Sequence, residues 1–206
     1  MRSFRIPVAL MLGLGVASVT LPPAEVAASR EKRNAIQRIA LEDDCDSRDL
    51  SWDEVGGCLL RKGTVTRAQF MLYSFFTPPT ATTPPGPPPG TPLANAVIGH
   101  PSWRNNPGYL AVEAGDRLRV VNTGGRDHTF TPVVDWGAGF VPPLSFGLRA
   151  APECADPAAV PVIEPGKRAQ VTGLTPGSHK FQCCIHPWMR TLVVVSEDDD
   201  ERDERE

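Results

Sequence analysis

The chain has little excess charge of either sign. Its 206 residues contain 21 lysines and arginines against 24 aspartates and glutamates, a formal net charge of −3. Residues 197–206 hold eight of these acids, and without them and the first 28 residues, 17 basic residues face 15 acidic ones. A near-neutral body has no basic surface for nucleic acid, so we expect no such partner. We interpret residues 197–206 as a solvated, disordered tail, with binding of a basic partner or loosely held cations as the alternative.

The sequence also has no hydrophobic run near its start that is long enough to cross a membrane. The apolar run over residues 6–21 is shorter than the roughly 20 residues that a spanning helix needs. A short basic segment precedes it and small residues, Val26-Ala27-Ala28, follow it, which predicts a signal peptide over residues 1–28 that is cleaved before Ser29. An uncleaved membrane anchor is the alternative. No cysteine precedes Cys45, which excludes a lipid anchor at the cleavage point. We expect an exported protein, periplasmic or secreted.

Length and proline content suggest how the rest of the chain is organised. The 178 residues after the predicted cleavage site leave room for one domain and a smaller appendage, and they exclude a large multidomain enzyme. Residues 77–92 are almost entirely Pro, Thr and Gly, which predicts a semi-rigid linker. Ahead of it, we interpret residues 29–76 as a small helical N-terminal appendage. Ile36, Ile39 and Ala40 have helical spacing, and Thr66 with Gln69 forms a capping-box pattern before an apolar run.

Residues 93–196 have a pattern typical of β-structure. Short segments rich in Val, Thr, Phe and Leu alternate with turn residues, over residues 96–99, 109–112, 117–122, 128–134, 169–174, 178–183 and 190–196. Several such strands in about 105 residues predict a mainly β fold, a Greek-key β-sandwich. Residues 135–166 are the exception, since they are long, proline-rich and weakly patterned. Loops of that length in compact domains tend to be functional.

Three soft or borderline metal ligands occur at three-residue spacing where the strand predicted over residues 178–183 ends. Cys183, His186 and Met189 offer a thiolate, an imidazole and a thioether. Copper cycling between Cu(I) and Cu(II) favours this mixture, and a trigonal set of two His and one Cys with a weak axial Met is the blue-copper arrangement. That arrangement needs one more histidine. His128, at the start of another predicted strand, is the best candidate, because loops at the ends of two strands can meet at one end of a sandwich.

At these residues the sequence resembles the cupredoxins, the plastocyanin and amicyanin family of small copper proteins. Cys183, His186 and Met189 lie in a Cys-x-x-His-Pro-x-Met segment that is similar to the short ligand loop of amicyanin, and a His-Thr-Phe segment begins at His128. The resemblance implies a cupredoxin-like sandwich that holds one copper ion in a type 1 site, with His128, Cys183 and His186 equatorial and Met189 axial. The residues flanking His128 differ from the family's usual Pro and Asn, which changes the expected hydrogen bonding around that ligand.

The same residues also have structural explanations. Cys183 could instead form half of a disulfide, and Met189 could be core filler. We interpret the other two histidines, His100 and His179, as structural. A structural zinc site made from Cys154, Cys183, Cys184 and His186 is a further alternative on ligand type, but it leaves Met189 and His128 without a role.

The number of cysteines supports the copper assignment. An exported protein with five cysteines should leave one unpaired, and a type 1 copper site needs one thiolate. We expect that cysteine to be Cys183, and we expect Cys45 to pair with Cys58 inside the appendage. Cys154 would then pair with Cys184, which should face away from the metal because neighbouring residues of a strand point to opposite sides.

The scarcity of histidine and methionine separates the remaining functions. Only four histidines are present, so the second copper cluster of a copper oxidase or reductase cannot be built, and we expect no enzyme. Of the four methionines, two lie in the predicted signal peptide. This weakens the alternative of a copper carrier or storage protein without an electron-transfer role.

We therefore predict a copper protein that transfers single electrons to and from a redox partner protein, which the sequence does not identify. No small-molecule substrate is evident, and contact with a membrane is expected only if the signal is uncleaved. The electron should leave through His186, whose ring edge we expect to reach the surface within an apolar rim of Pro187 and Trp188. Trp188 could equally be a structural residue that caps the hydrophobic end of the sandwich.

Overall fold

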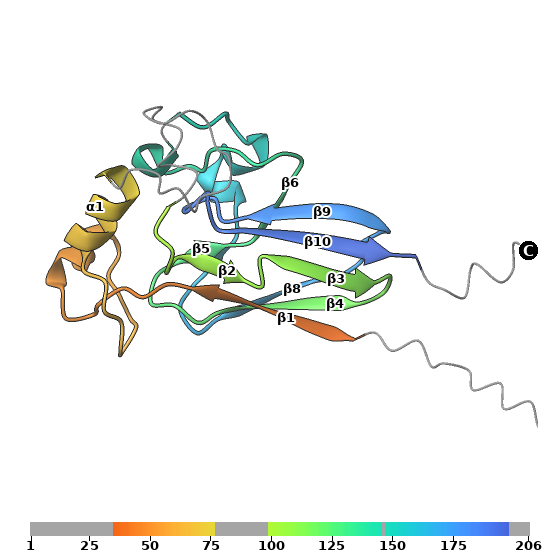
Figure 1. The fold of residues 1–206 in the computed structure, drawn as a ribbon, viewed down its shortest axis with the longest axis horizontal. Coiled ribbons are helices and arrows are strands. Elements are labelled where there is room, and N and C mark those ends of the chain that lie inside the picture. Colours follow the sequence, from red (N-terminus) through yellow and green to blue (C-terminus); the bar gives the residue numbers. More distant parts are fainter. Residues whose placement is uncertain (1–34, 77–98, 146, 198–206) are drawn as a thin grey trace, which may run out of the picture. The chain divides into compact units, whose positions relative to one another are not determined.

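The computed structural model describes residues 35–76, 99–145 and 147–197, shown in colour in Figure 1. They all belong to one compact unit. The predicted signal peptide, the predicted linker and the acidic tail after Glu197 lie outside the described residues. In the three described ranges, no helix is both long and apolar enough to span a membrane.

The first sheet has the strand order β2-β1-β4-β8. Its strands are β1 (Ile36–Glu42), β2 (Arg104–Asn106), β4 (Arg117–Asn122) and β8 (Arg168–Val171). Strand β1 is parallel to β4 and antiparallel to β2, while β4 is antiparallel to β8. Ile39 and Leu41 on β1 and Leu118 and Val120 on β4 are fully buried. Because strand residues alternate between two faces, this places one apolar face of the sheet against the core.

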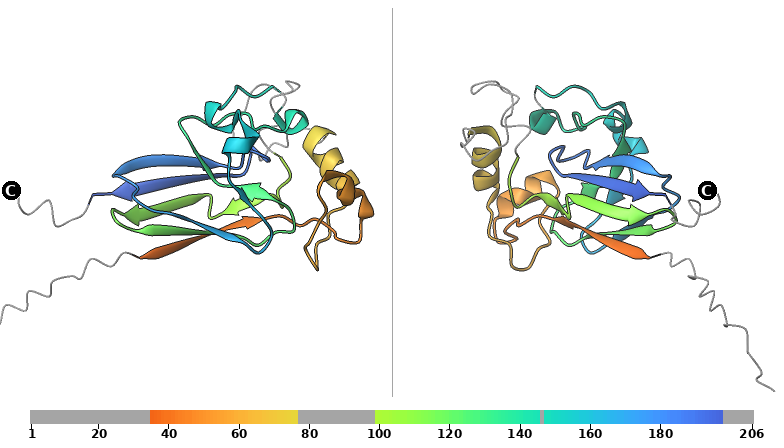
Figure 2. Two further views of the ribbon diagram at one scale, coloured as in Figure 1. Left: turned by 180° about the vertical axis from the view of Figure 1, so that it is seen from behind. Right: turned by 45° about the vertical axis from the view of Figure 1, so that its right-hand side comes forward.

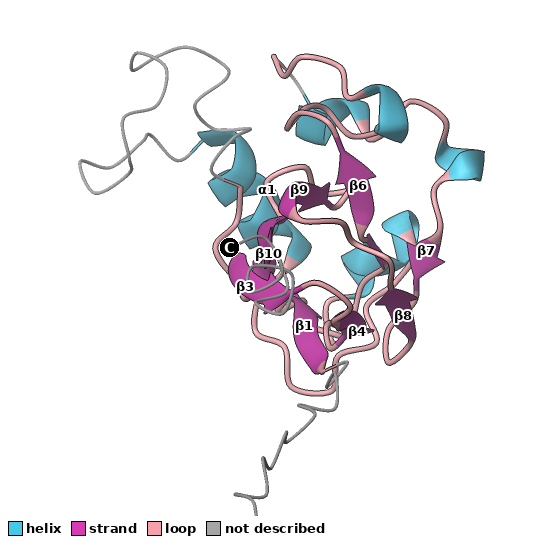
Figure 3. Cartoon of the chain, turned by 90° about the vertical axis from the view of Figure 1, so that its right-hand side faces the viewer, coloured by secondary structure: helices cyan, strands magenta, loops and turns pink. Residues whose placement is uncertain are grey.

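The second sheet has the order β3-β10-β9-β6. Its strands are β3 (Tyr109–Glu113), β10 (Arg190–Ser196), β9 (Gly177–Gln182) and β6 (Thr131–Val133). Strand β10 is parallel to β3 and antiparallel to β9. Val193, Val195 and Phe181 join the buried residues of the first sheet in one apolar cluster. Figure 3, turned by 90° from Figure 1, shows these strands in magenta.

The predicted mainly β sandwich is confirmed. Five predicted segments correspond to β3, β4, β8, β9 and β10, and the segment over residues 128–134 is divided into β5 (His128–Thr129) and β6. The segment over residues 96–99 lies almost wholly outside the described residues. Three strands were not predicted: β1, β2 and β7 (Val162–Ile163), which pairs with β5.

The helix predicted at the start of the appendage is wrong, since Ile36–Glu42 is the strand β1. The spacing of Ile36, Ile39 and Ala40 fits one helix face, but the residues that the fold buries completely are Ile39 and Leu41, with the period of two that a strand requires. Backbone pairing with β2 and β4 on either side decides in favour of the strand. It also buries a segment that contains isoleucine, a residue favoured in sheets.

Residues 43–76, which we call the N-terminal lobe, contain the short 3-10 helix η1 (Leu50–Val55) and the helix α1 (Arg67–Phe76). The predicted capping box is confirmed: the Gln69 amide donates to Thr66 Oγ1 at 3.2 Å, and the Thr66 amide donates to Gln69 Oε1 at 2.8 Å. The predicted disulfide between Cys45 and Cys58 is present. It ties the segment that leaves β1 to the segment that precedes α1.

The N-terminal lobe is not a separate appendage, because it packs directly on the sandwich. Arg126 donates through its guanidinium to the carbonyls of Val55 and Gly57, and it lies over the Trp52 ring at 5.0 Å. Trp52 itself is stacked on the buried Trp103 at 5.9 Å. Figure 2 shows the lobe, in orange and yellow, beside the end of the strands in both views. The described residues of the lobe and of the sandwich therefore belong to one unit, while the predicted linker over residues 77–92 lies outside the described residues.

The proline-rich insertion over residues 135–166 forms its own small apolar cluster beside β6. It contains three 3-10 turns, η2 (Pro142–Ser145), η3 (Pro152–Cys154) and η4 (Pro157–Ala159), as well as β7. Val133, Ala151, Val160 and the two cysteines of the predicted Cys154–Cys184 disulfide are buried together. The disulfide thereby fixes the insertion to Cys184, the residue next to Cys183.

Candidate metal centre

The loop that carries the Cys-x-x-His-x-x-Met pattern connects β9 to β10. It is a tight turn, because the Cys183 amide donates to the Met189 carbonyl and the Met189 amide donates to the His186 carbonyl, each at 2.9 Å. These bonds fold the segment from Cys183 to Met189 into a turn. Cys183, His186 and Met189 are all buried as a result.

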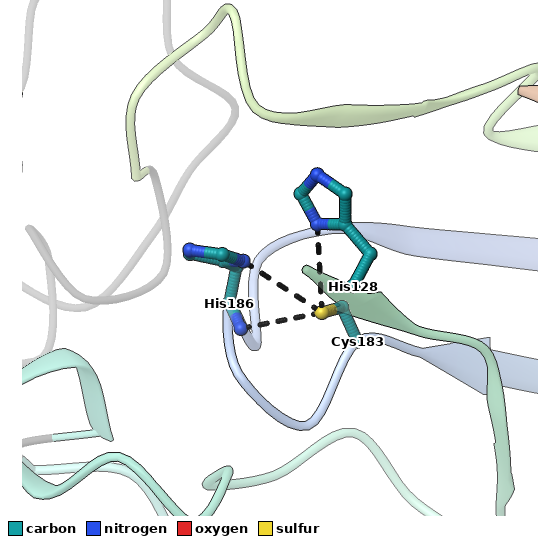
Figure 4. Close-up of side chains that lie close together, drawn as sticks. All are labelled: His128, Cys183 and His186. Atoms are coloured by element: carbon teal, nitrogen blue, oxygen red, sulfur yellow. Dashed lines mark hydrogen bonds between the residues drawn. The ribbon is translucent and has the colours of Figure 1, made fainter. Parts of the chain in front are cut away.

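His128 reaches the same point from β5. Its Nδ1 lies 3.9 Å from the Cys183 sulfur, and the Nδ1 of His186 lies 3.8 Å from that sulfur (Figure 4). The three ligand atoms all lie within 4.8 Å of one another, and all three residues are buried. The structure thus brings together residues that are 55 positions apart in the sequence, as the sequence analysis expected.

These distances fit the spacing that three atoms bound to one metal ion would have. Bonds of about 2.0–2.1 Å to nitrogen and 2.3 Å to sulfur, set at 120°, place a nitrogen and the sulfur about 3.7–3.8 Å apart. The observed sulfur-to-nitrogen separations are 3.8 and 3.9 Å. Met189 is fully buried in the same apolar cluster as Cys183. The donor set of thiolate, two imidazoles and thioether is the set that suits copper in a type 1 site.

Comparisons with known proteins find matches among solved structures and none among family models or curated sequences. Among solved structures, a purple cupredoxin from Nitrosopumilus maritimus is 19% identical over 47% of this chain and 86% of its own, with a TM-score of 0.34. A Cu(I) amicyanin mutant is 22% identical over 45% of this chain and 73% of its own, with a TM-score of 0.32. Both TM-scores are below 0.5, so the fold assignment rests on the two packed sheets and the ligand cluster at their end.

The fold is cupredoxin-like. The structure brings three of the four predicted ligands, His128, Cys183 and His186, into one buried cluster. Cys183 is the one cysteine of the described residues outside a disulfide. The two histidines interpreted as structural lie elsewhere. His100 contacts the aromatic rings of the N-terminal lobe, and His179 bonds to the Thr175 carbonyl at 2.7 Å.

The surroundings of Cys183 favour a thiolate. The backbone amides of Thr129 and His186 lie 3.3 and 3.4 Å from its sulfur and donate to it. Burial alone would raise the pKa of the thiol, but hydrogen bonds with His128 and His186 and their charges outweigh it and hold the pKa well below its ordinary value. An anionic sulfur is the form that binds metal.

The outer nitrogen of His128 bonds to a residue that the sequence analysis did not single out. His128 Nε2 lies 2.9 Å from Asp43 Oδ2, and neither side chain is exposed to solvent. Burial opposes protonation of His128, but the hydrogen bond to Asp43 and the interactions with Cys183 outweigh it and raise the pKa of His128 to about 9. Burial also opposes ionisation of Asp43, but the bonds from His128 and from the amides of Gly125 and Arg126 outweigh it and lower the pKa of this carboxyl group.

His186 does not reach the surface, which corrects the expectation that its ring edge is exposed. It is only 4% exposed. Its ring lies 6.2 Å from Phe70 of the N-terminal lobe, 6.4 Å from Trp103 and 5.5 Å from Trp188. This burial lowers the pKa of His186. We call Phe70, Trp103 and Trp188 the aromatic cover.

Proposed function

We propose that this protein is an exported type 1 copper protein that binds one copper ion through His128, Cys183, His186 and Met189 and transfers single electrons. The observation that carries the proposal is the buried Cys183 sulfur, which lies 3.8 and 3.9 Å from two imidazole nitrogens. Copper in such a site supplies a one-electron couple between Cu(II) and Cu(I). The protein's own residues hold the ligands and exclude water.

A rigid, buried ligand set supports electron transfer over metal delivery. Two backbone amides donate to the Cys183 sulfur, and the next residue, Cys184, is held by the disulfide to Cys154. His128 is held from behind by Asp43. Ligands fixed in this way change little between oxidation states, whereas a delivery protein needs ligands that open. The same burial is compatible with storage, so the carrier or storage alternative requires a direct test.

Because His186 is buried, the electron cannot pass directly from its ring edge to a partner. Trp188 is the member of the aromatic cover that is partly exposed, and its indole nitrogen donates to the Trp103 carbonyl at 3.1 Å, which fixes the ring. We propose that a redox partner protein docks near Trp188 and that the electron crosses this ring on its way to or from His186. Export by the N-terminal signal and the absence of catalysis are parts of the same proposal.

Two rates distinguish electron transfer from metal delivery. Stopped-flow mixing of the reduced, copper-loaded protein with a small inorganic oxidant gives the electron-exchange rate, and incubation with the Cu(I) chelator bicinchoninate gives the rate of copper loss. We expect fast electron exchange and slow copper loss. Rapid loss to the chelator with slow exchange would favour the carrier or storage role. Trp188→Glu should slow the reaction with a protein partner more than the reaction with the small oxidant.

A further inference from the structure

The Asp43 carboxylate lies next to His128, one of the proposed copper ligands, and its described neighbours donate hydrogen bonds to it. Oδ1 accepts from the Gly125 amide at 2.9 Å, and Oδ2 accepts from the Arg126 amide at 3.0 Å and from His128 Nε2 at 2.9 Å. The backbone at Gly124 passes so close that a Cβ there would lie 2.0 Å from Oδ2. The loop that leads to His128 is therefore wrapped around this one carboxylate.

The hydrogen bond fixes which nitrogen of His128 is available to a metal. The carboxylate also accepts from the Cys45 amide at 3.3 Å. A carboxylate that already accepts three amide donors holds the proton of the imidazole on Nε2. Once a binding metal has displaced the second proton of the ring, the lone pair is on Nδ1, the atom that faces the Cys183 sulfur at 3.9 Å. The hydrogen bond to Asp43 also orients the ring, because it holds Nε2 while Nδ1 faces the Cys183 sulfur.

The charge of Asp43 also acts on the oxidation states. A buried negative charge one imidazole ring away from the metal stabilises Cu(II) more than Cu(I), because the oxidised ion carries one more positive charge and little solvent separates the two. A hydrogen-bonded carboxylate also makes the imidazole a stronger donor. Both effects favour the oxidised state.

We propose that Asp43 is a positioning residue that orients His128 for copper and lowers the reduction potential of the site. The inference rests on the proposed function, since it concerns the same copper. It also gives the N-terminal lobe a role in the chemistry. Asp43 is the first residue of the lobe, between β1 and the disulfide-bonded Cys45, so the segment that tunes the copper lies far in sequence from every ligand.

A matched pair of variants tests the proposal. Asp43→Asn removes the charge and turns one acceptor into a donor, while Asp44→Asn removes the same charge one residue away, where the carboxylate bonds to Thr64 Oγ1 at 2.6 Å in an exposed position. The readouts are the midpoint potential, the Cu(II) affinity and the spectrum of the copper protein. Loss of a carboxylate behind a ligand histidine typically lowers metal affinity about 10- to 100-fold.

We expect Asp43→Asn to weaken Cu(II) binding within that range, to weaken Cu(I) binding less and to raise the potential. Each tenfold difference between the two affinities corresponds to about 59 mV for a one-electron couple. Asp44→Asn should leave all three readouts close to the wild type. If both variants have the same potential, even with Asp43→Asn less stable, the role of Asp43 is structural and the proposal is wrong. A wild type that binds no copper would instead refute the proposed function, and this inference with it.

Should Asp43→Asn fail to fold, NMR on the wild-type Cu(I) protein gives the answer. The proposal predicts that the Nε2-bound proton of His128 is shifted downfield and protected from exchange with water, as expected for a hydrogen bond to a buried carboxylate. An Nε2-bound proton that exchanges as fast as that of an exposed imidazole would overturn it.

Discussion

Phe70 is the residue through which the N-terminal lobe covers the metal centre, and Phe70→Ala should detach that cover. The side chain is 4% exposed. Its ring contacts Trp52 at 5.6 Å and Trp103 at 4.6 Å, besides the ring of His186 at 6.2 Å. Truncation leaves a cavity among aromatic rings that are held by separate parts of the chain, so the site cannot easily collapse around it.

Truncation of a buried phenylalanine costs about 3–5 kcal/mol of the free energy of unfolding. Alanine is the better helix former by a few tenths of a kcal/mol, so the expected loss in α1 comes entirely from packing. For a domain of this size, about 2–4 °C of melting temperature is lost per kcal/mol, or roughly 6–20 °C in all. The copper colour should persist, since Phe70 supplies no ligand.

Leu72 is the matched control, because it lies on the same helix and is 61% exposed. Urea unfolding of the copper-loaded proteins, followed by circular dichroism and by the copper absorption, compares Leu72→Ala with Phe70→Ala. The control should change the free energy of unfolding by less than about 0.5 kcal/mol. If the two variants are equally stable, Phe70 is not packed as described and the account of the buried His186 fails.

Three further predictions concern the ligands and their supports. In the metal-free protein the pKa of His128 is about 9, so below that pH copper must displace a proton from this ring, and the copper affinity should rise about tenfold per pH unit between pH 6.5 and 8. A copper affinity that does not change with pH, measured by chelator competition, would contradict this. Replacing both Cys154 and Cys184 with serine opens a bridge that spans 30 residues and should cost about 3–4 kcal/mol of the free energy of unfolding, whereas an unchanged unfolding midpoint would exclude a structural role. Gly124→Ala places a Cβ 2.0 Å from Asp43 Oδ2 and should destabilise the protein by about 1–3 kcal/mol in the same assay, while full stability would show that the loop has room.

The strands of the β-sandwich and the Cys183 to Met189 loop could be predicted because their signals are local. Segments rich in Val and Leu define β4 and β10 within six or seven residues, and three ligands share one short loop. Strand β1 lacks such a signal, since its spacing fits a helix as well, and its partners lie beyond residue 100. Strands β2 and β7 have only three and two residues, too few for a pattern.

The surroundings of the metal centre could not be predicted for the same reason. Asp43 lies in a run of acidic residues with nothing to set it apart, and its contact with His128 joins residues 85 positions apart. The burial of His186 depends on Phe70, which reaches it only because the N-terminal lobe is fixed to the sandwich. Chain topology decides both contacts, whereas the ligand loop alone suggests an exposed histidine.

The optical spectrum of the purified, oxidised protein after addition of Cu(II) tests the central claim most directly. Thiolate bound to Cu(II) in a type 1 geometry absorbs intensely in the visible, and we predict one copper per chain, an intense colour and its disappearance in Cys183→Ser with the β-sandwich still folded. A wild type that takes up zinc and no copper at equal exposure, or a Cys183→Ser variant that keeps the colour, would contradict the account.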